Sequence, residues 1–538
     1  MKNRSVLGSA WFMSGMVALF ALYVTWFCQR TYLGNPYAVS DDARQYLFQC
    51  FRWGDPALFQ GDFLTAYASA LTPIGWKAVY WVLSKLMDVI TISKMLPFVL
   101  CPISAVLIFL TGRKLWSNAA GAFAAIAFVL YVWHISCFSG GFPRAFGFPL
   151  AAWFLYLCAC DRFAWAGWLC LLQAGFYPPV ALVCGSVWLV LRWASLDSSG
   201  GKVRAARLLL LLVLGVVSLV LFSRIHPTPW FGQMYTWPDI LHMREFFLGG
   251  RTPMLLSDWH RLTTDFSIQE RVWGVELDSP VIWVVFVMAC GAVWLALRRI
   301  VTIPAFIPIG LLSAVVWYAV SWALLLDLFL PGRLLKFMVP LLSVLLAGAF
   351  WDRVEVWLSK FKTAWVRWML PFFICVWAWP AFLPQTNDYS GDRPLFEFIA
   401  RLPADALIAG MPSDMDGVPL FSKRKAFLTE ELSLPFYRAY YREVQRRALV
   451  LFSIYYATDK SELKRMCARE NICYIVAKPR DFEQAFLKDG AFFVEPYNAV
   501  VRHLVARVGT GDFVLKDPPE ASVVFRTDKA VVIDVNAL

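Results

Sequence analysis

The chain has 538 residues, of which 59% are hydrophobic and only 16% are charged, and its mean hydropathy is +0.57. A soluble domain averages about 25% charged residues, so most of this chain is expected to lie in a membrane. Residues 387–538 hold 21 basic and 21 acidic residues, which leaves 29 of the 50 basic and 17 of the 38 acidic residues, and hence the whole net charge of +12, in the apolar part. Because this excess lies in short loops between apolar segments, it indicates cytoplasmic anchoring and disfavours nucleic-acid binding.

Apolar segments recur along the first 383 residues, and a transmembrane helix needs about 20 apolar residues in a row. The first segment follows a basic tip and lacks a small-x-small site near its end, so it is predicted to be a membrane helix and not a cleaved signal peptide. Eleven spans are predicted, near residues 6–28, 89–111, 117–136, 146–160, 164–177, 178–194, 208–223, 281–297, 303–326, 334–351 and 366–383.

Two details of this layout carry alternatives. The short segments 164–177 and 178–194 meet at Tyr177-Pro178-Pro179 and form either a tilted pair or a re-entrant hairpin. The stretch 71–87 mixes lysines with aromatic residues and is predicted to be an interfacial helix. The basic loops all fall on one side, which is therefore the cytoplasm. The opposite side carries the loops 29–88, 137–145 and 224–280, the turn 327–333, and everything after residue 384.

The sequence thus predicts a polytopic α-helical membrane domain over 1–383, with its first outer loop at 29–88, and an extracytoplasmic domain over 384–538. In this tail, helix and strand patterns alternate, which is typical of an α/β fold. A helix and a strand are expected in 394–410, a strand in 424–430, a helix in 434–457, a helix and a strand in 461–479, and strands at 514–517 and 530–535. Cys467 and Cys473 suit apolar core positions here, with a disulfide as the alternative.

The first outer loop is unusually acidic, since SDDARQYLFQCFRWGDPALFQGDF (40–63) contains four aspartates. A carboxylate near the low-dielectric boundary has a raised pKa unless cations neutralise it, and it can serve as a general base toward a substrate hydroxyl. Asp41 and Asp42 are the candidates. The alternative is that either residue simply caps a helix over 42–53. Asp55, which precedes a proline, fits a helix cap, whereas a structural role for Asp62 is less obvious from the sequence.

The acidic pair in VSDDARQ, two helices in the same loop, about eleven spans and a trailing outer domain resemble the GT-C superfamily of integral-membrane glycosyltransferases. The arrangement of spans and domains resembles this superfamily over the whole chain, but a sequence motif is shared only in the first loop. There, DARQ…DPALFQGDF is similar to uncharacterised bacterial members. It implies a GT-C-like fold, a polyprenyl-phosphate sugar as donor and a base at Asp41 or Asp42. The tail has no WWDYG-like motif, which disfavours peptide N-glycosylation.

A departing lipid phosphate requires fixed cations, and the arginine fork matches phosphate oxygens. Arg144 and Arg333 lie in short Gly/Pro loops at the ends of spans, and Lys336 follows in LPGRLLKF. Snorkelling of these side chains to headgroups is the alternative. Further candidates for substrate contacts are Arg44, Asp55, Asp62, His134 and Arg271. The sequence shows no run of metal ligands, so neither a metal nor another cofactor is expected.

The favoured function is a glycosyltransferase that moves a sugar from a polyprenyl-phosphate donor to an outer glycan, lipid or protein acceptor with inversion. The alternatives are a lipid-linked glycan flippase, which would place ionisable residues at mid-membrane, and a polysaccharide polymerase or ligase of another fold. The only Asn-x-Ser/Thr site is Asn3 on the cytoplasmic tip, which favours a bacterial inner membrane over an endoplasmic reticulum.

Overall fold

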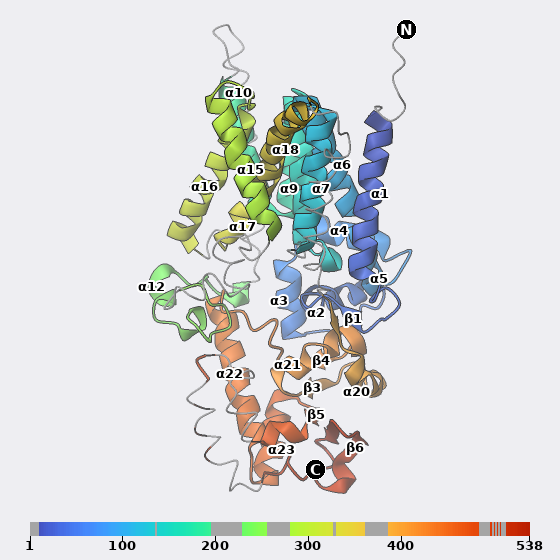
Figure 1. Cartoon of the computed structure of the whole chain (residues 1–538). Helices are drawn as coiled ribbons and strands as arrows, with labels where there is room; N and C mark the ends of the chain where they lie inside the picture. The colour runs from blue at the N-terminus through green and yellow to red at the C-terminus, as the bar shows by residue number, and fades with distance from the viewer. Residues whose placement is uncertain are drawn as a thin grey trace. The chain divides into compact units, whose positions relative to one another are not determined.

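The structure is a computed structural model of the whole chain (Figure 1). It describes residues 10–134, 137–194, 229–255, 280–325, 330–360, 386–483, 495–497 and 513–538, and the single positions 500, 503 and 506. The chain divides into two compact units. Unit 1 comprises Met1–Pro36, Pro73–Ile225 and Trp259–Thr386, and unit 2 comprises Tyr37–Thr72, His226–Asp258 and Asn387–Leu538.

Unit 1 is a helical bundle (Figure 1). Its described helices are α1 (Ala10–Gln29), α4 (Ile74–Leu83), α5 (Val89–Met95), α6 (Pro97–Leu115), α7 (Asn118–His134), α8 (Gly147–Ala159), α9 (Phe163–Phe176), α10 (Pro178–Ala194), α15 (Pro280–Leu297), α16 (Phe306–Leu324), α17 (Gly332–Leu335) and α18 (Met338–Leu358), with 3₁₀ turns η3 (Ser139–Gly141) and η4 (Pro143–Phe146).

Four segments of the described part are long and apolar enough to cross a membrane, at Ala10–Gln29, Val89–Leu115, Phe306–Leu324 and Gly332–Leu358. Shorter apolar helices cover 118–133, 163–176, 178–194 and 281–297. These helices overlap the corresponding predicted spans. The predicted spans at 208–223 and 366–383 lie outside the described residues, so the total of eleven stays a prediction.

Small residues allow the helices of unit 1 to pack closely. A Cβ on Gly121 of α7 would lie 2.3 Å from the carbonyl oxygen of Phe109 in α6, and a Cβ on Gly348 of α18 would lie 2.4 Å from the carbonyl oxygen of Ala120. Close backbone approach at small residues is the usual way in which helices associate in lipid, where no hydrophobic force drives them together. Helices α6, α7 and α18 therefore form the centre of the bundle.

The segment 71–87, which is predicted to be interfacial, contains α4. Trp76 and Tyr80 on this helix are buried and stack at 4.0 Å between ring centroids. The Trp76 indole donates a hydrogen bond of 2.8 Å to the carbonyl oxygen of Gly141. The inner face of α4 is thus fixed to the loop before α8, while Trp81 remains 51% exposed.

Unit 2 assembles three separate parts of the sequence. The first part contains β1 (Ala38–Val39), α2 (Ala43–Tyr46), the 3₁₀ helix η2 (Phe48–Trp53) and α3 (Phe63–Leu71), and the second contains η5 (Pro229–Phe231), α12 (Trp237–Ile240) and η6 (Arg244–Phe246). The third contains β2 (Asn387–Asp388), η9 (Ser390–Asp392), α20 (Arg393–Ile399), β3 (Leu407–Ala409), α21 (Pro412–Met415), η10 (Val418–Ser422), β4 (Lys425–Ala426), α22 (Arg438–Tyr455), α23 (Lys460–Glu470), β5 (Tyr474–Ala477), η11 (Pro479–Phe482), η12 (Glu520–Ser522), β6 (Val523–Arg526) and β7 (Val531–Asp534).

Aromatic packing holds the first part of unit 2 against the third. Tyr440 of α22 stacks on Tyr67 of α3 at 3.6 Å between ring centroids and on Phe63 at 4.6 Å. Phe231 of η5 packs edge-on against the Tyr67 ring at 5.4 Å. Such pairs add about 0.5–1.5 kcal/mol each beyond the area they bury. The aromatic side chains of α3 are therefore packed against α22 in the C-terminal segment of the chain.

The larger sheet of unit 2 has the strand order β4-β3-β5-β7-β6. Strands β4, β3 and β5 pair in parallel, whereas β7 pairs antiparallel with both β5 and β6. The helices and strands expected around 394–410, 424–430, 434–457, 461–479 and 530–535 are present. The strand expected at 514–517 is wrong, because this segment forms a turn, and β6 lies a few residues later. Cys467 is a free, buried cysteine, as the core interpretation predicts, whereas Cys473 is free but only half-buried, so it does not lie in the core.

Candidate active site

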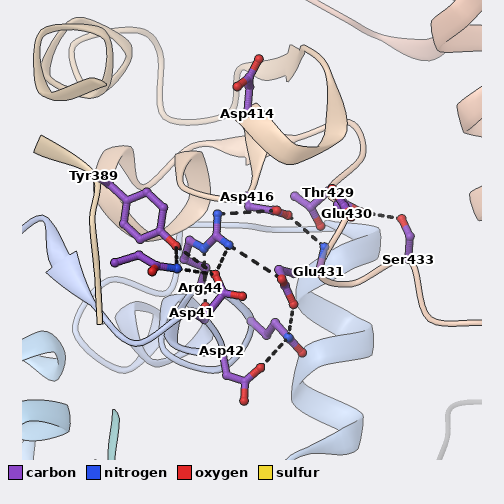
Figure 2. A network of polar contacts seen from close by, with 12 residues as sticks. Asp41, Asp42, Arg44, Tyr389, Asp414, Asp416, Thr429, Glu430, Glu431 and Ser433 are labelled. Atoms are coloured by element: carbon purple, nitrogen blue, oxygen red, sulfur yellow. Dashed lines mark hydrogen bonds and ion pairs between the residues drawn. The ribbon is translucent and has the colours of Figure 1, made fainter. Parts of the chain in front are cut away.

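A small antiparallel ribbon brings the acidic first loop to the C-terminal segment within unit 2. Strands β1 and β2 pair with Ala38 opposite Asp388 and Val39 opposite Asn387. The Tyr389 amide continues this ribbon with a hydrogen bond of 3.0 Å to the carbonyl oxygen of Tyr37. As a result, the side chains that follow each strand, Asp41 on one side and Tyr389 on the other, lie together (Figure 2).

The two oxygens of the Asp41 carboxylate have different surroundings (Figure 2). Oδ1 accepts hydrogen bonds from the Tyr389 hydroxyl at 2.9 Å and the Asn387 amide at 3.3 Å, and it also forms an ion pair with Arg44. Among the residues that the structure describes, nothing bonds Oδ2, and the side chain is 52% exposed. One oxygen therefore fixes the carboxylate, and the other is free to accept a proton.

Opposing effects set the protonation of Asp41. Partial burial raises the pKa of its carboxyl, but the charge of Arg44 and the hydrogen bonds from Tyr389, Arg44 and Asn387 outweigh this effect, so the pKa lies below its usual value. Asp41 is consequently ionised at neutral pH. The sequence analysis expected a raised pKa for this carboxyl unless a cation lay nearby, and Arg44 is that cation.

Arg44 is the centre of the network. Its side chain is only 10% exposed, and its Nη atoms lie 3.6 Å from Asp416 and 3.7 Å from Glu431, in addition to the contact with Asp41. Its guanidinium also lies over the ring of Tyr389, 4.6 Å from the centroid. Three carboxylates and an aromatic face thus fix Arg44, which in turn orients Asp41.

A second layer of acidic groups lies behind Arg44. Glu431 pairs with Arg251 at 3.1 Å, and its backbone amide donates to the Asp416 carboxylate at 3.0 Å. Burial raises the pKa of Glu431 to about 7, and the negative charges of the first-loop aspartates act in the same direction. Burial likewise raises the pKa of Asp416 well above its usual value. Glu431 can therefore hold a proton near neutral pH, whereas Asp41 cannot.

The remaining first-loop aspartates have structural partners. Asp42 occupies the position before α2 but makes no capping hydrogen bond there, and its Oδ1 accepts from the Gln45 amide at 3.1 Å. Asp55 accepts from the Ala57 amide at 3.0 Å in a turn, without a helix to cap. Asp62 caps α3 by accepting from the Thr65 amide at 2.8 Å and is 8% exposed. The helix expected over 42–53 is divided into α2 and η2.

Three of the predicted cations form a basic cluster in unit 1, consisting of Arg144, Arg333 and Lys336. They lie around Tyr177, the residue between α9 and α10. Phe337, next to Lys336, packs against the Tyr177 ring at 4.9 Å between centroids, and Phe146 of η4, which contains Arg144, packs against Phe176 at 4.9 Å. Lys336 is only 3% exposed, whereas Arg333 is exposed and the Arg144 guanidinium lies 5.3 Å from the ring of Phe142. The cluster concentrates positive charge at helix ends, as phosphate recognition requires.

The side chains of two predicted site residues, His134 and Arg271, lie outside the described part of the structure. His134 is the last residue of α7, and its side chain lies outside the described part. Arg271 lies outside the described residues altogether. Within the described ranges, no group of three or more His, Cys, Asp or Glu side chains is arranged to hold a metal ion.

The sequence analysis missed the partners that the C-terminal segment supplies, namely Asn387, Tyr389, Asp416, Glu431 and Glu430, whose carbonyl oxygen accepts from Arg251 Nε at 2.9 Å. The sequence signal for the two glutamates was visible, since TEEL places adjacent glutamates at the end of a predicted strand in a domain with a buried core. Their pairing with the first loop could not be found, because nothing local in the sequence indicates a contact across 386 positions, such as the one between Gln45 and Glu431.

The fold resembles that of known membrane glycosyltransferases. The oligosaccharyltransferase of Archaeoglobus fulgidus, tethered to an acceptor peptide, aligns over 92% of this chain and 72% of its own, with a TM-score of 0.52 and 8% identity. The same archaeal enzyme, AglB, with an inhibitory peptide and a dolichol-phosphate aligns equally far, with a TM-score of 0.52 and 9% identity. ArnT from Cupriavidus metallidurans aligns over 97% of both chains with a TM-score of only 0.48 and 13% identity, and carries no weight.

No protein-family model matches the sequence, and no curated protein matches it in sequence. At such low identity the structural likeness establishes the fold alone. The chain therefore has a fold similar to that of the archaeal oligosaccharyltransferase, and four segments of its described part are long and apolar enough to cross a membrane.

Proposed function

We propose that this protein is a membrane glycosyltransferase in which Asp41 is the general base. The observation that carries the proposal is the asymmetry of the Asp41 carboxylate, with three donors on Oδ1 and none of the described groups on Oδ2. A carboxylate that is ionised, held in one orientation and partly exposed is the arrangement that proton abstraction from a substrate hydroxyl requires. The Asp42 carboxylate is instead bound to the Gln45 amide within its own helix, so Asp41 is the preferred base of the pair.

In the proposed reaction, the acceptor hydroxyl gives its proton to Oδ2 of Asp41 while its oxygen attacks the anomeric carbon of the sugar. The bond from that carbon to the lipid-phosphate oxygen breaks, and the phosphate leaves with the bonding electron pair. A single displacement of this kind inverts the anomeric configuration. A positioned general base of this kind typically contributes about 10²–10⁴-fold to the rate.

The basic cluster of Arg144, Arg333 and Lys336 is proposed to bind the phosphate of a polyprenyl-phosphate donor. Arginine can grip two phosphate oxygens at once, and a buried ammonium adds charge where the leaving group becomes more negative. The archaeal structure with dolichol-phosphate shows a lipid phosphate bound to a protein of this fold, and this supports the same class of donor here. Arg44, Asp55 and Asp62 are proposed to act structurally, through the contacts described above.

The topology and location are part of the same proposal. Residues 1–383 form the transmembrane part and residues 384–538 an extracytoplasmic part in a bacterial inner membrane. The acceptor is then an outer glycan, lipid or protein. The basic loops that the sequence analysis assigned to the cytoplasm support this orientation.

The test is a sugar-transfer assay with purified protein in proteoliposomes, a panel of undecaprenyl-phosphate-linked sugars and a lipid and glycan extract as acceptor. Release of undecaprenyl phosphate is measured by mass spectrometry. Asp41→Asn should lower the rate about 10²–10⁴-fold. Asp55→Asn is the matched control, because it makes the same chemical change in the same loop at a turn-forming residue, and it should retain the wild-type rate within about twofold. Full activity of Asp41→Asn would refute the assignment of the base, and inactivity of the wild type with every donor would refute the function.

A further inference from the structure

A pocket of about 450 Å³ opens on unit 2 next to the candidate base. Three segments line it: the ribbon end from β2 to η9, the residues from the end of β5 into η11, and the turn between β6 and β7. All of these residues belong to the described part of unit 2. The volume falls within the range of about 300–1,000 Å³ that is typical of small-ligand sites.

The floor of the pocket holds an organised set of charges. The Lys478 side chain is 9% exposed, and its ammonium lies 2.9 Å from Oδ1 of Asp414 and 3.6 Å from Asp392. Arg480 donates to the same Asp414 oxygen at 2.7 Å, while 46% of its side chain remains exposed. Asp414 therefore anchors two cations side by side. The ion pairs with Asp414 and Asp392 hold the Lys478 ammonium in place, so a hydrogen-bond donor and an acceptor are already positioned before a ligand binds.

The lining contains charged hydrogen-bond donors and acceptors in nearly equal numbers. Three cationic side chains, Lys478, Arg480 and Lys529, face four carboxylates, which include Asp392 and Asp528. A polyanion would be repelled by the four carboxylates, and the seven charged side chains of the lining are unfavourable for a lipid tail. Sugar hydroxyls both donate and accept hydrogen bonds, so a neutral, polyhydroxylated ligand matches this lining.

Tyr389 connects the pocket to the proposed chemistry. Its side chain lines the pocket, and its hydroxyl donates to Asp41 at 2.9 Å. A ligand in the pocket is thus one side chain away from the candidate base. We propose that this pocket binds a neutral glycan, so that the acceptor of the reaction is itself a carbohydrate. The identification of the glycan as the acceptor rests on the proposed glycosyltransferase function, whereas glycan binding to the pocket can be measured without it.

The experiment measures binding of maltotriose, mannotriose and chitotriose to the full-length protein in nanodiscs, by saturation-transfer NMR and calorimetry, with sodium tripolyphosphate as an anionic probe. Two variants alter the pocket. Asp528→Asn combined with Lys529→Gln changes the exposed turn at the rim, and Asp392→Asn changes the acceptor beside Lys478. The matched control is Glu520→Gln combined with Arg526→Gln, which removes an exposed ion pair of 2.8 Å outside the pocket lining.

At least one trisaccharide should bind the wild type and the control equally, and both pocket variants should weaken that binding about three- to tenfold. Equal binding in all four proteins, no binding of any trisaccharide, or binding of tripolyphosphate alone would overturn the proposal. Because this readout needs no donor, failure of the proposed function would appear separately, as absent sugar transfer with trisaccharide binding intact.

Discussion

The acidic layer behind Arg44 makes a prediction about pH and stability that does not require a substrate. Replacing Glu431 by glutamine keeps the shape of the side chain and removes its titration. The wild-type carboxyl has a pKa of about 7 in the folded protein, against 4.5 for the ordinary group, chiefly because it is buried. Its side chain is 14% exposed, so little solvent screening weakens the effect.

The sign of the effect follows from proton linkage. Between pH 4.5 and 7 the folded protein binds a proton at Glu431 that the unfolded chain has released, so the free energy of unfolding falls as the pH rises through this window. At about 1.36 kcal/mol for each pH unit, the full cost approaches about 3 kcal/mol above pH 7. The Glu431→Gln variant has no such cost, because its amide does not titrate. The variant should therefore gain stability over the wild type as the pH rises.

The assay is thermal unfolding in detergent, followed by intrinsic fluorescence at pH 5, 6, 7 and 8 with one ionic strength and one scan rate. For a unit of this size about 1 kcal/mol corresponds to about 2–4 °C, so the difference in Tm between Glu431→Gln and wild type should change by several degrees in favour of the variant. Glu397→Gln, at an exposed ion pair on α20, is the control and should show a constant difference. A constant difference for Glu431→Gln as well would refute the reasoning about this buried carboxyl.

Two further substitutions test the site and the bundle. Tyr389→Phe removes a hydrogen bond that lowers the pKa of Asp41, so the acidic limb of the pH–rate profile should move to higher pH; a lower rate with an unmoved limb would show that Tyr389 does not act through Asp41. Gly121→Ala places a Cβ 2.3 Å from a backbone oxygen of α6 and should cost about 1–3 kcal/mol, measured as a lower Tm. Gly185→Ala, in α10 with nothing within 4 Å of the added Cβ, should cause no such loss, and equal Tm values for the two variants would contradict the packing argument.

The sequence predicted the helical bundle well, because apolar length is a local property. The described helices α1, α6, α16 and α18 follow directly from runs of apolar residues, and the amphipathic pattern of 434–457 predicts α22. Short strands were harder to find. The strand β6 and the ribbon β1–β2 comprise only two to four residues each, and neither has a pattern distinct from a loop.

The candidate site was predicted only in part, for the same physical reason. The aspartates of the first loop stood out because carboxylates are unusual in so apolar a chain. Their environment depends on Tyr389, Asn387 and Glu431, which lie more than 340 positions away and meet Asp41 and its neighbours only through the pairing of β1 with β2. The structural roles of Asp55 and Asp62 became evident only when their backbone partners were known.

The most direct test of the central claim is a cryo-EM map of the protein bound to a non-hydrolysable phosphonate analogue of an undecaprenyl-phosphate sugar. The account predicts that the anomeric carbon lies near enough to Oδ2 of Asp41 for an acceptor hydroxyl to bridge the two. A map with the sugar bound elsewhere, and with Asp41 contacting only Arg44, Asn387 and Tyr389, would contradict it.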